Sequence, residues 1–183
     1  MNKKILMSGM SIVASLAMLG GSAFAAFATS ASATDSTFST GTDNLLVSSD
    51  NNNDYASSIT SPFTGVNIGP GFTKTYTFFL KNDDTNSTDN LDVTASFANG
   101  TGDTGLENAL NTQFSCNNGA NPSAFNVASM LAGQVSLGTI NSGAIATCTL
   151  TVSLPSTADN SVSGKNVKFD VVFNGATAVT PTP

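Results

Sequence analysis

Hydrophobic and polar residues alternate in four stretches of this chain, and each stretch is typical of a β-strand. The alternation spans residues 75–81, 91–97, 146–154 and 167–173. In each stretch one set of positions is apolar, and the other set carries mainly Thr, Ser, Asp or Lys. Successive side chains of a strand point to opposite faces, so one face would pack and the other would meet water. The pattern predicts antiparallel sheets that are solvated on one side.

Turn-forming residues separate these stretches. Gly69-Pro70-Gly71 precedes the first of them, a polar loop covers residues 82–90, and residues 155–164 link the last two. Short strands divided by such turns indicate a sandwich or a jelly roll. We therefore expect an all-β fold, a jelly-roll-like antiparallel β-sandwich with one or two short helices inserted and an N-terminal signal helix in front.

Two helices are expected inside the strand pattern. The first would span Leu106–Phe114, where apolar residues recur at i, i+4 and i+8. The second would span Ser123–Leu131 and follow Pro122, a residue that suits the first helical turn. Cys116 lies between the two, so a bridge from it to Cys148 would fasten this insertion to the sheet.

The N-terminus has the pattern of an export signal. Two lysines precede an apolar run over residues 5–19, and Gly20-Gly21 and further small residues follow. Cleavage would fall after Ala25 or Ala26, so that the mature chain would begin at Ala26 or Phe27. An uncleaved membrane anchor is the alternative, because residues 5–34 carry no charge and are long enough to span a bilayer.

Cleavage would leave one domain. Removing residues 1–26 from the 183-residue chain leaves 157 residues, which is enough for a single core. The expected organisation is a signal peptide over 1–26, an N-terminal arm over 27–35, a β-sandwich domain over 36–175 and a flexible tail over 176–183.

The charge and the missing histidines exclude several function classes. The whole chain carries six Lys and Arg residues against twelve acidic ones, so it offers no basic surface for nucleic acid. It contains no histidine, which removes a Ser-His-Asp triad, a Cys-His dyad and a His-Glu-x-x-His zinc site. Glu107 among aspartates offers no convincing acid/base pair. We expect that the protein is not an enzyme.

The two cysteines, Cys116 and Cys148, both follow the signal. An even pair in an exported chain favours a disulfide. Two buried free thiols are the alternative, and two cysteines without histidine make a poor zinc site.

Calcium is the one metal for which the chain offers candidates. Asp50, Asp54, Asp83 and Asp84 place oxygen ligands in loops. No Glu or fixed glycine completes an EF-hand, so an ordinary solvated loop is the favoured interpretation. Asn86 and Asn99 begin glycosylation sequons, although chance matches are expected in a chain so rich in Asn and Thr.

Three groups of motifs lie at both ends and in the middle of the chain, and they leave residues 99–134 uncovered. They are Gly20-Gly21 with Ala25-Ala26-Phe27 and Thr37-Phe38-Ser39-Thr40-Gly41-Thr42; Pro70-Gly71 before an aromatic-rich strand and Asn82-Asp83; and Leu154-Pro155, Asn160 and Gly164 before the strand that ends at Phe173. In these three places the chain resembles the TasA/camelysin family of exported biofilm-matrix fibre proteins.

The resemblance implies an exported jelly roll that a dedicated signal peptidase trims. It also implies that the freed N-terminal segment adds as a strand to the next subunit. Small β-tolerant residues fit such a role, and main-chain hydrogen bonds would provide the affinity. A leader with no role is the alternative. On this chain the donor strand would comprise Phe27, Ala28, Thr29, Ser30, Ala31, Ser32, Ala33 and Thr34.

The leading functional hypothesis is a secreted structural subunit of the cell surface or biofilm matrix. It would polymerise head to tail with itself, after export and signal-peptidase cleavage and without a lasting membrane anchor. The alternative is a monomeric cell-surface binding module, for which Phe63, Phe72 and Phe79 are the candidate exposed aromatics. A secreted camelysin-like metallopeptidase is the third hypothesis, and the missing histidines argue against it. No cofactor is expected apart from the weak calcium candidates.

Overall fold

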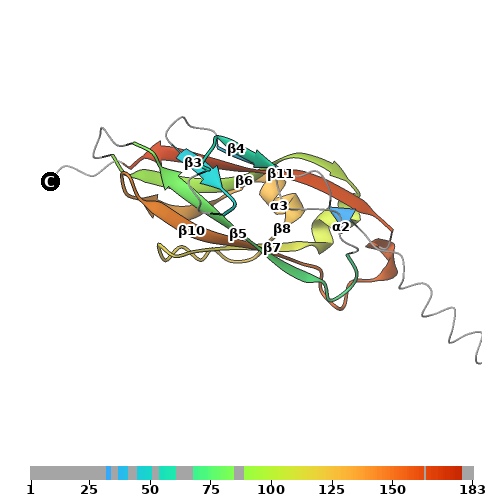
Figure 1. Cartoon of the computed structure of the whole chain (residues 1–183). Helices are drawn as coiled ribbons and strands as arrows, with labels where there is room; N and C mark the ends of the chain where they lie inside the picture. The colour runs from blue at the N-terminus through green and yellow to red at the C-terminus, as the bar shows by residue number, and fades with distance from the viewer. Residues whose placement is uncertain are drawn as a thin grey trace, which may run out of the picture.

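The computed structural model describes residues 32–33, 37–40, 45–50, 54–60, 68–84, 89–162 and 164–178. In this part of the chain two β-sheets pack face to face, and two short helices lie beside them (Figure 1). All neighbouring strands run antiparallel except where β1 and β2 meet β11. The predicted signal helix lies outside the described residues. The prediction of a mainly antiparallel, all-β fold is confirmed.

In the first sheet the C-terminal strand β11 lies between N-terminal strands on one side and strands from the middle of the chain on the other. The strand order is β4-β2-β11-β6-β9, and β1 also pairs with β11. The long pair β11–β6 forms its centre, with one register shift between Lys168 and Asp170. The strands are β1 (Ser32–Ala33), β2 (Thr37–Thr40), β4 (Ser58–Thr60), β6 (Leu91–Gly102), β9 (Gln134–Ile140) and β11 (Asn166–Thr177).

The second sheet has the order β3-β5-β10-β7-β8, with every neighbouring pair antiparallel. Its centre is β10, which pairs along its whole length with β5 and along part of it with β7. The strands are β3 (Leu45–Ser48), β5 (Thr73–Asn82), β7 (Asn111–Cys116), β8 (Phe125–Asn126) and β10 (Ile145–Ser153).

The core lies between the sheets, and the apolar positions of the four alternating stretches supply much of it. Across the two sheets, the Phe78 ring contacts Phe173, and the Phe114 ring contacts Phe97 and Phe173. The ring centroids of Phe97 and Phe169 lie 4.4 Å apart, and those of Phe78 and Phe173 lie 4.9 Å apart. Burying these large rings supplies much of the hydrophobic stabilisation that holds the two sheets together.

The first predicted helix is too long. Helix α2 spans Thr104–Ala109, and Asp103 caps it by accepting a hydrogen bond from the Leu106 amide. From Leu110 onward the burial alternates, and Asn111–Cys116 pairs with β10 as a strand. The i, i+4, i+8 spacing that suggested a helix is also a multiple of two, so it fits a strand equally well.

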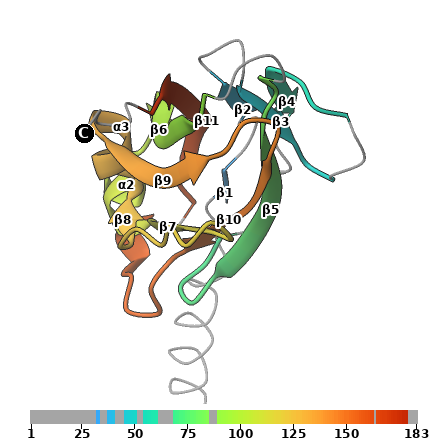
Figure 2. The same cartoon turned by 90° about the vertical axis from the view of Figure 1, so that its left-hand side faces the viewer.

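The second predicted helix begins later than expected. Helix α3 spans Val127–Ala132, and the Asn126 side chain caps it by accepting from the Ser129 amide at 2.7 Å. Phe125 and Asn126 form β8, so Pro122 does not occupy the first helical turn. Both helices lie beside β8 and β9, on the side of the molecule away from β2 and β4 (Figure 2). The chain also forms a 3-10 turn, η1, at Asn160–Val162.

Candidate functional site

The N-terminal strands β1 and β2 are added in parallel to one side of β11 (Figure 2). Ser32 lies opposite Asn166, and Phe38 lies opposite Val171. Six steps along the N-terminal chain (32 to 38) therefore match five along β11 (166 to 171), so the register shifts by one residue between β1 and β2. The first and last strands of the described chain thus pair by main-chain hydrogen bonding, and β1 enters the sheet at the end where β11 begins.

Only part of the predicted donor strand is described. Ser32 and Ala33 form β1, whereas the remaining predicted donor residues lie outside the described residues, as do Ala25, Ala26 and Phe27 of the expected cleavage site. The pairing with β11 continues in β2, beyond the arm boundary predicted at residue 35. The sequence signal for β2 is weak, because a four-residue Thr-Phe-Ser-Thr segment offers a single apolar position to any alternation.

The predicted cysteine pair forms a disulfide at the centre of the second sheet. Cys116 and Cys148 lie directly opposite each other on β7 and β10, with an S–S distance of 2.03 Å. Both are buried. The bridge therefore joins two neighbouring strands of one sheet, and the expectation that it fastens a two-helix insertion to the sheet is wrong. The reason is that Cys116 belongs to β7 itself.

The turn after β7 closes the gap between the two sheets on this side. Asn118 donates hydrogen bonds from Nδ2 to the carbonyl oxygens of Leu137 at 2.8 Å and Thr139 at 3.3 Å, both on β9. Its Oδ1 accepts from the Ala120 amide at 3.2 Å. A single side chain of the second sheet's turn thus bonds the main chain of the first sheet's edge strand.

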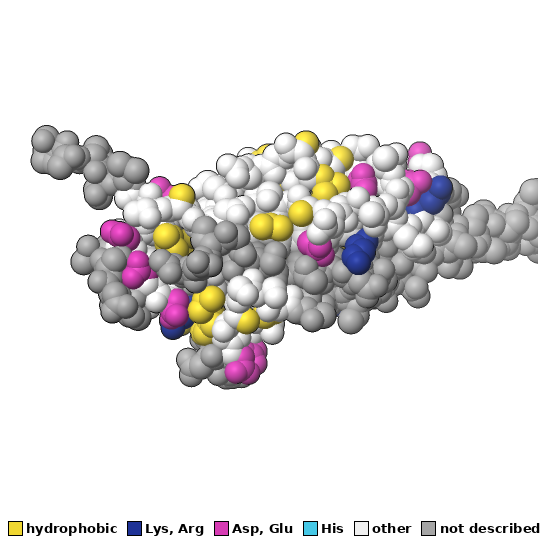
Figure 3. Space-filling model, turned by 90° about the horizontal axis from the view of Figure 1, so that it is seen from above, with side chains coloured by type: hydrophobic (Ala, Val, Ile, Leu, Met, Phe, Trp, Pro, Cys, Tyr) yellow, Lys and Arg dark blue, Asp and Glu magenta, His cyan; other side chains and the backbone are white. Residues whose placement is uncertain are grey.

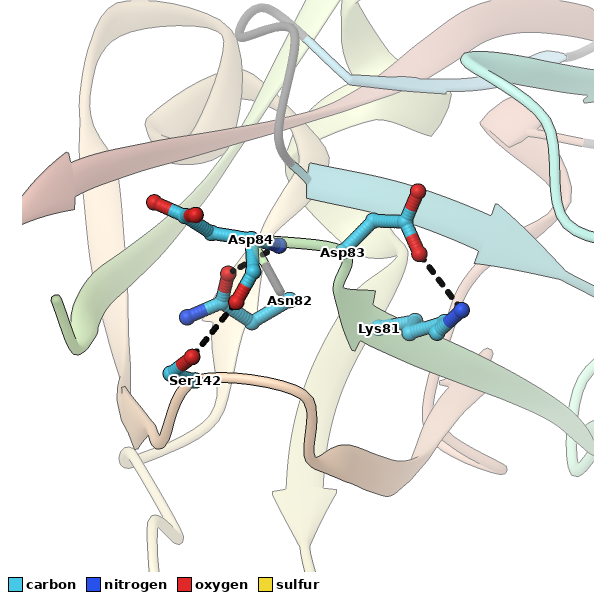
Figure 4. A network of polar contacts seen from close by, with 5 residues as sticks. All are labelled: Lys81, Asn82, Asp83, Asp84 and Ser142. Atoms are coloured by element: carbon cyan, nitrogen blue, oxygen red, sulfur yellow. Dashed lines mark hydrogen bonds and ion pairs between the residues drawn. The ribbon is translucent and has the colours of Figure 1, made fainter. Parts of the chain in front are cut away.

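The two calcium-ligand candidates that follow β5, Asp83 and Asp84, point their carboxylates in different directions (Figure 4). The Asp83 carboxylate forms an ion pair with Lys81, and the Asp84 carboxylate points to the opposite side. The Asp84 main chain is held at both ends, since its amide donates to Asn82 Oδ1 and its carbonyl accepts from the Ser142 hydroxyl. This geometry fixes the main chain of Asp84 and does not gather oxygen ligands around one point.

The Asn82 side chain holds main-chain groups of two other segments at this end of the sandwich. This side chain is fully buried, with 0% exposure, and donates to the carbonyl oxygens of Asp89 at 3.0 Å and Ile140 at 3.2 Å. A buried amide needs such partners, because leaving it unbonded would cost free energy. The polar residue that ends β5 therefore ties both sheets together at this end of the sandwich.

The other candidate ligands are equally separate. Asp50 accepts from the Ser48 hydroxyl, and Asp54 is exposed. Within the described ranges no group of three or more acidic or cysteine side chains could hold a metal ion together. Of the two sequons, Asn86 lies outside the described residues. Asn99 lies on β6 with φ +52° and donates to Asp170 at 2.6 Å.

Two aspartates have lowered pKa values because of hydrogen bonds. The ion-paired hydrogen bond from Lys165, supported by the Leu106 amide, lowers the pKa of Asp103. The Ser161 hydroxyl and amide lower the pKa of Asp159. Both carboxylates are anchored at turns or helix ends, so their perturbation is structural in origin and does not mark an acid/base pair.

The surface has little concentrated chemistry. In the view of Figure 3 the acidic and hydrophobic side chains form small separate groups among uncharged polar surface. A shallow hollow of about 420 Å³ lies where Leu131 and Gly133 meet Ser96 and Gln134.

No helix in the described ranges is long and apolar enough to cross a membrane. Comparison of the sequence with protein-family models finds no match, and comparison with curated proteins finds none either.

Proposed function

We propose that this protein is an exported structural subunit that polymerises by N-terminal donor-strand complementation. The products would be extracellular fibres or pilus-like filaments of a biofilm matrix. The observation that carries the proposal is the parallel pairing of β1 and β2 with β11. This pairing uses main-chain hydrogen bonds, which do not depend on which copy of the chain supplies the strand.

Exchange of this strand between copies would give a filament. Each copy would receive an N-terminal strand on its β11 and would hand its own strand to the next copy. Such a contact joins two different surfaces of the subunit, so it propagates as an open filament unless the rotation between copies closes a ring. Exchange of an identical element needs no new contacts, because the β11 side already fits this sequence.

Export is supported by the disulfide as well as by the N-terminal pattern. A buried bridge between Cys116 and Cys148 is stable in oxidising compartments outside the cytosol. The proposal therefore includes cleavage by a signal peptidase, a mature chain starting at Ala26 or Phe27, and no lasting membrane anchor. It also takes the two packed sheets to be a jelly roll, with no enzymatic activity and no resident cofactor.

The test is negative-stain electron microscopy of the mature protein, starting at Phe27 and concentrated at neutral pH. We expect regular filaments from the mature chain and folded monomers from a variant that lacks residues 27–35. A variant that lacks residues 179–183 is the matched control, since it is also a short terminal truncation and should still form filaments. Filaments that persist without residues 27–35 would sink the donor-strand mechanism.

One surface observation favours the second candidate, a monomeric surface-binding module. Ile145 is 41% exposed and lies on the outer face of the second sheet, opposite Lys81 and next to the half-buried Phe79. Of the other aromatic candidates, Phe72 is half-buried and Phe63 lies outside the described residues. A mature chain that stays monomeric, and binds a surface glycan through a site that Phe79→Ala weakens, would favour this function.

A further inference from the structure

We propose that Asn118 is an edge guard, a side chain that prevents a second copy of this chain from pairing with β9. The inference rests on the proposed function, because it explains why strand addition would be confined to β11. The occupant that Asn118 excludes is the β9 strand of another copy, paired antiparallel about a two-fold axis.

β9 is an edge strand whose ladder with β6 has one irregularity, at Leu137, but which carries neither of the two commonest edge protections, charge and proline. It pairs with β6, and no further strand pairs with it in the described part of the chain. Its seven residues, Gln-Val-Ser-Leu-Gly-Thr-Ile, include neither a charged residue nor a proline. Exposed main-chain groups on such a strand are a template for pairing with another chain, and natural proteins usually blunt them with charge, proline or a cover.

Asn118 covers β9 at this irregularity. Its Nδ2 donates to the carbonyl oxygens of both Leu137 and Thr139, so both oxygens face the turn that carries Asn118. A neighbouring strand would donate its amides to these two oxygens. The Asn118 amide nitrogen donates to both instead, so it occupies the positions that a partner strand would need.

The surrounding chain is shaped for this contact. Gly138 lies between the two bonded carbonyls with φ +80°, where glycine is favoured. A Cβ atom there would lie 2.9 Å from Asn118 Nδ2 and 3.3 Å from Ala120 Cβ. The Ala120 amide fixes Asn118 Oδ1, which orients Nδ2 toward β9. The disulfide at Cys116, two residues earlier, anchors the turn that carries Asn118.

The open sides of β11 and β9 therefore differ in whether another copy of the chain could replace the group that bonds them. On β11 the cover is main chain from residues 32–33 and 38–40, which another copy can supply in the same form. On β9 the cover is one side chain in a turn tied to its own sheet, which another copy's strand could replace only by displacing it. Asn118 thereby favours filaments of single width over laterally paired ones.

The test compares the mature chain with Asn118→Ala and Asn118→Ser, which remove the amide donor. Asn121→Ala is the matched control, since Asn121 follows the same turn and its side chain bonds Ser115 and the Gly119 carbonyl instead of β9 carbonyls. Sedimentation velocity over a concentration series measures self-association, and amide hydrogen exchange locates it. Both Asn118 variants should associate about tenfold more tightly than the wild type. Exchange should slow in residues 134–140 as concentration rises.

The proposal is overturned if both Asn118 variants sediment like the wild type while keeping the disulfide and a cooperative melting transition. Failure of both variants to fold would overturn it too, since Asn118 would then be a structural residue. The result is separable from the proposed function. A wild type that forms no filaments rejects the fibre proposal, whereas the difference in association between wild type and Asn118 variants still decides the role of Asn118.

Discussion

The two sides of the sandwich are closed by different kinds of bond. On the side of β7, β8 and β9, a disulfide, the Asn118 amide and helix α3 connect the elements. On the other side of the first sheet, β11 is covered by the main chain of β1 and β2, with β4 outside them. The disulfide and the Asn118 side chain connect specific residues within one copy of the chain. A main-chain ladder can be supplied equally well by a strand from another copy, which is why we assign strand exchange to the β11 side.

The largest expected effect removes the core that both sides share. Phe169 on β11 is fully buried, and its ring stacks on Phe97. Phe169→Ala should lower the free energy of unfolding by about 3–5 kcal/mol through lost burial and the cavity left behind. Urea titration measures the loss. Phe79→Ala on the outer face is the control, and equal losses for the two variants would show that β11 is not a shared core strand.

Removing the disulfide should weaken mainly the β7 side. The bridge closes a loop between residues 32 apart in sequence, so replacing both cysteines by alanine should lower the free energy of unfolding by about 3–4 kcal/mol. Denaturant midpoints with and without reductant measure the effect. Reductant should shift the wild type and leave the double variant unchanged. A wild-type denaturant midpoint that stays the same after the unfolded protein has been treated with reductant would contradict the prediction.

A smaller effect is expected from the cap of helix α3. Asn126 accepts a hydrogen bond from the Ser129 amide, which would otherwise lack a partner in the helix. Asn126→Ala should lower the free energy of unfolding by about 0.5–2 kcal/mol. Asn126→Asp keeps the acceptor and should stay close to the wild type, as measured by thermal unfolding. A loss as large for Asp as for Ala would show that the hydrogen bond is not the cause.

The smallest expected effect concerns the ion pair between Asp103 and Lys165, next to the start of β11, and the pH dependence of stability. Lys165 lowers the pKa of Asp103 in the folded state, so the charged carboxylate favours folding. This contribution is present above the ordinary aspartate pKa, near 4, and is lost as the pH falls through the lower folded value. In acid titrations of stability below about pH 4, Asp103→Asn should flatten part of the wild-type slope. Identical slopes would argue against this contribution.

The four amphipathic strands could be predicted because each has one buried and one wet face. Their alternation appears in the sequence whatever the strand pairs with. The short strands β2, β4 and β8 could not, since two to four residues contain too little alternation to read. The predicted helix wrongly includes residues 110–114, because leucine and phenylalanine four residues apart suit a helix and a strand alike. Tertiary pairing with β10 selects the strand.

The candidate site was predicted even less completely. Strand donation by the N-terminal segment is implied only by the family resemblance, and nothing in the segment indicates β11 as the acceptor or that β2 continues the pairing. The role of Asn118 had no sequence signal, because an asparagine before a glycine is an ordinary turn residue. Its two bonds reach β9, about twenty positions later in the chain.

The sequence by itself determined that the chain is β-rich, which faces of its long strands are apolar, and that its two cysteines suit a bridge. These properties depend on each residue and its near neighbours. The tertiary structure alone decided which strands meet, which edges are covered by main chain and which by a side chain. Those outcomes depend on register between distant segments, such as Ser32 beside Asn166. Main-chain pairing carries little side-chain information from which such a register could be read.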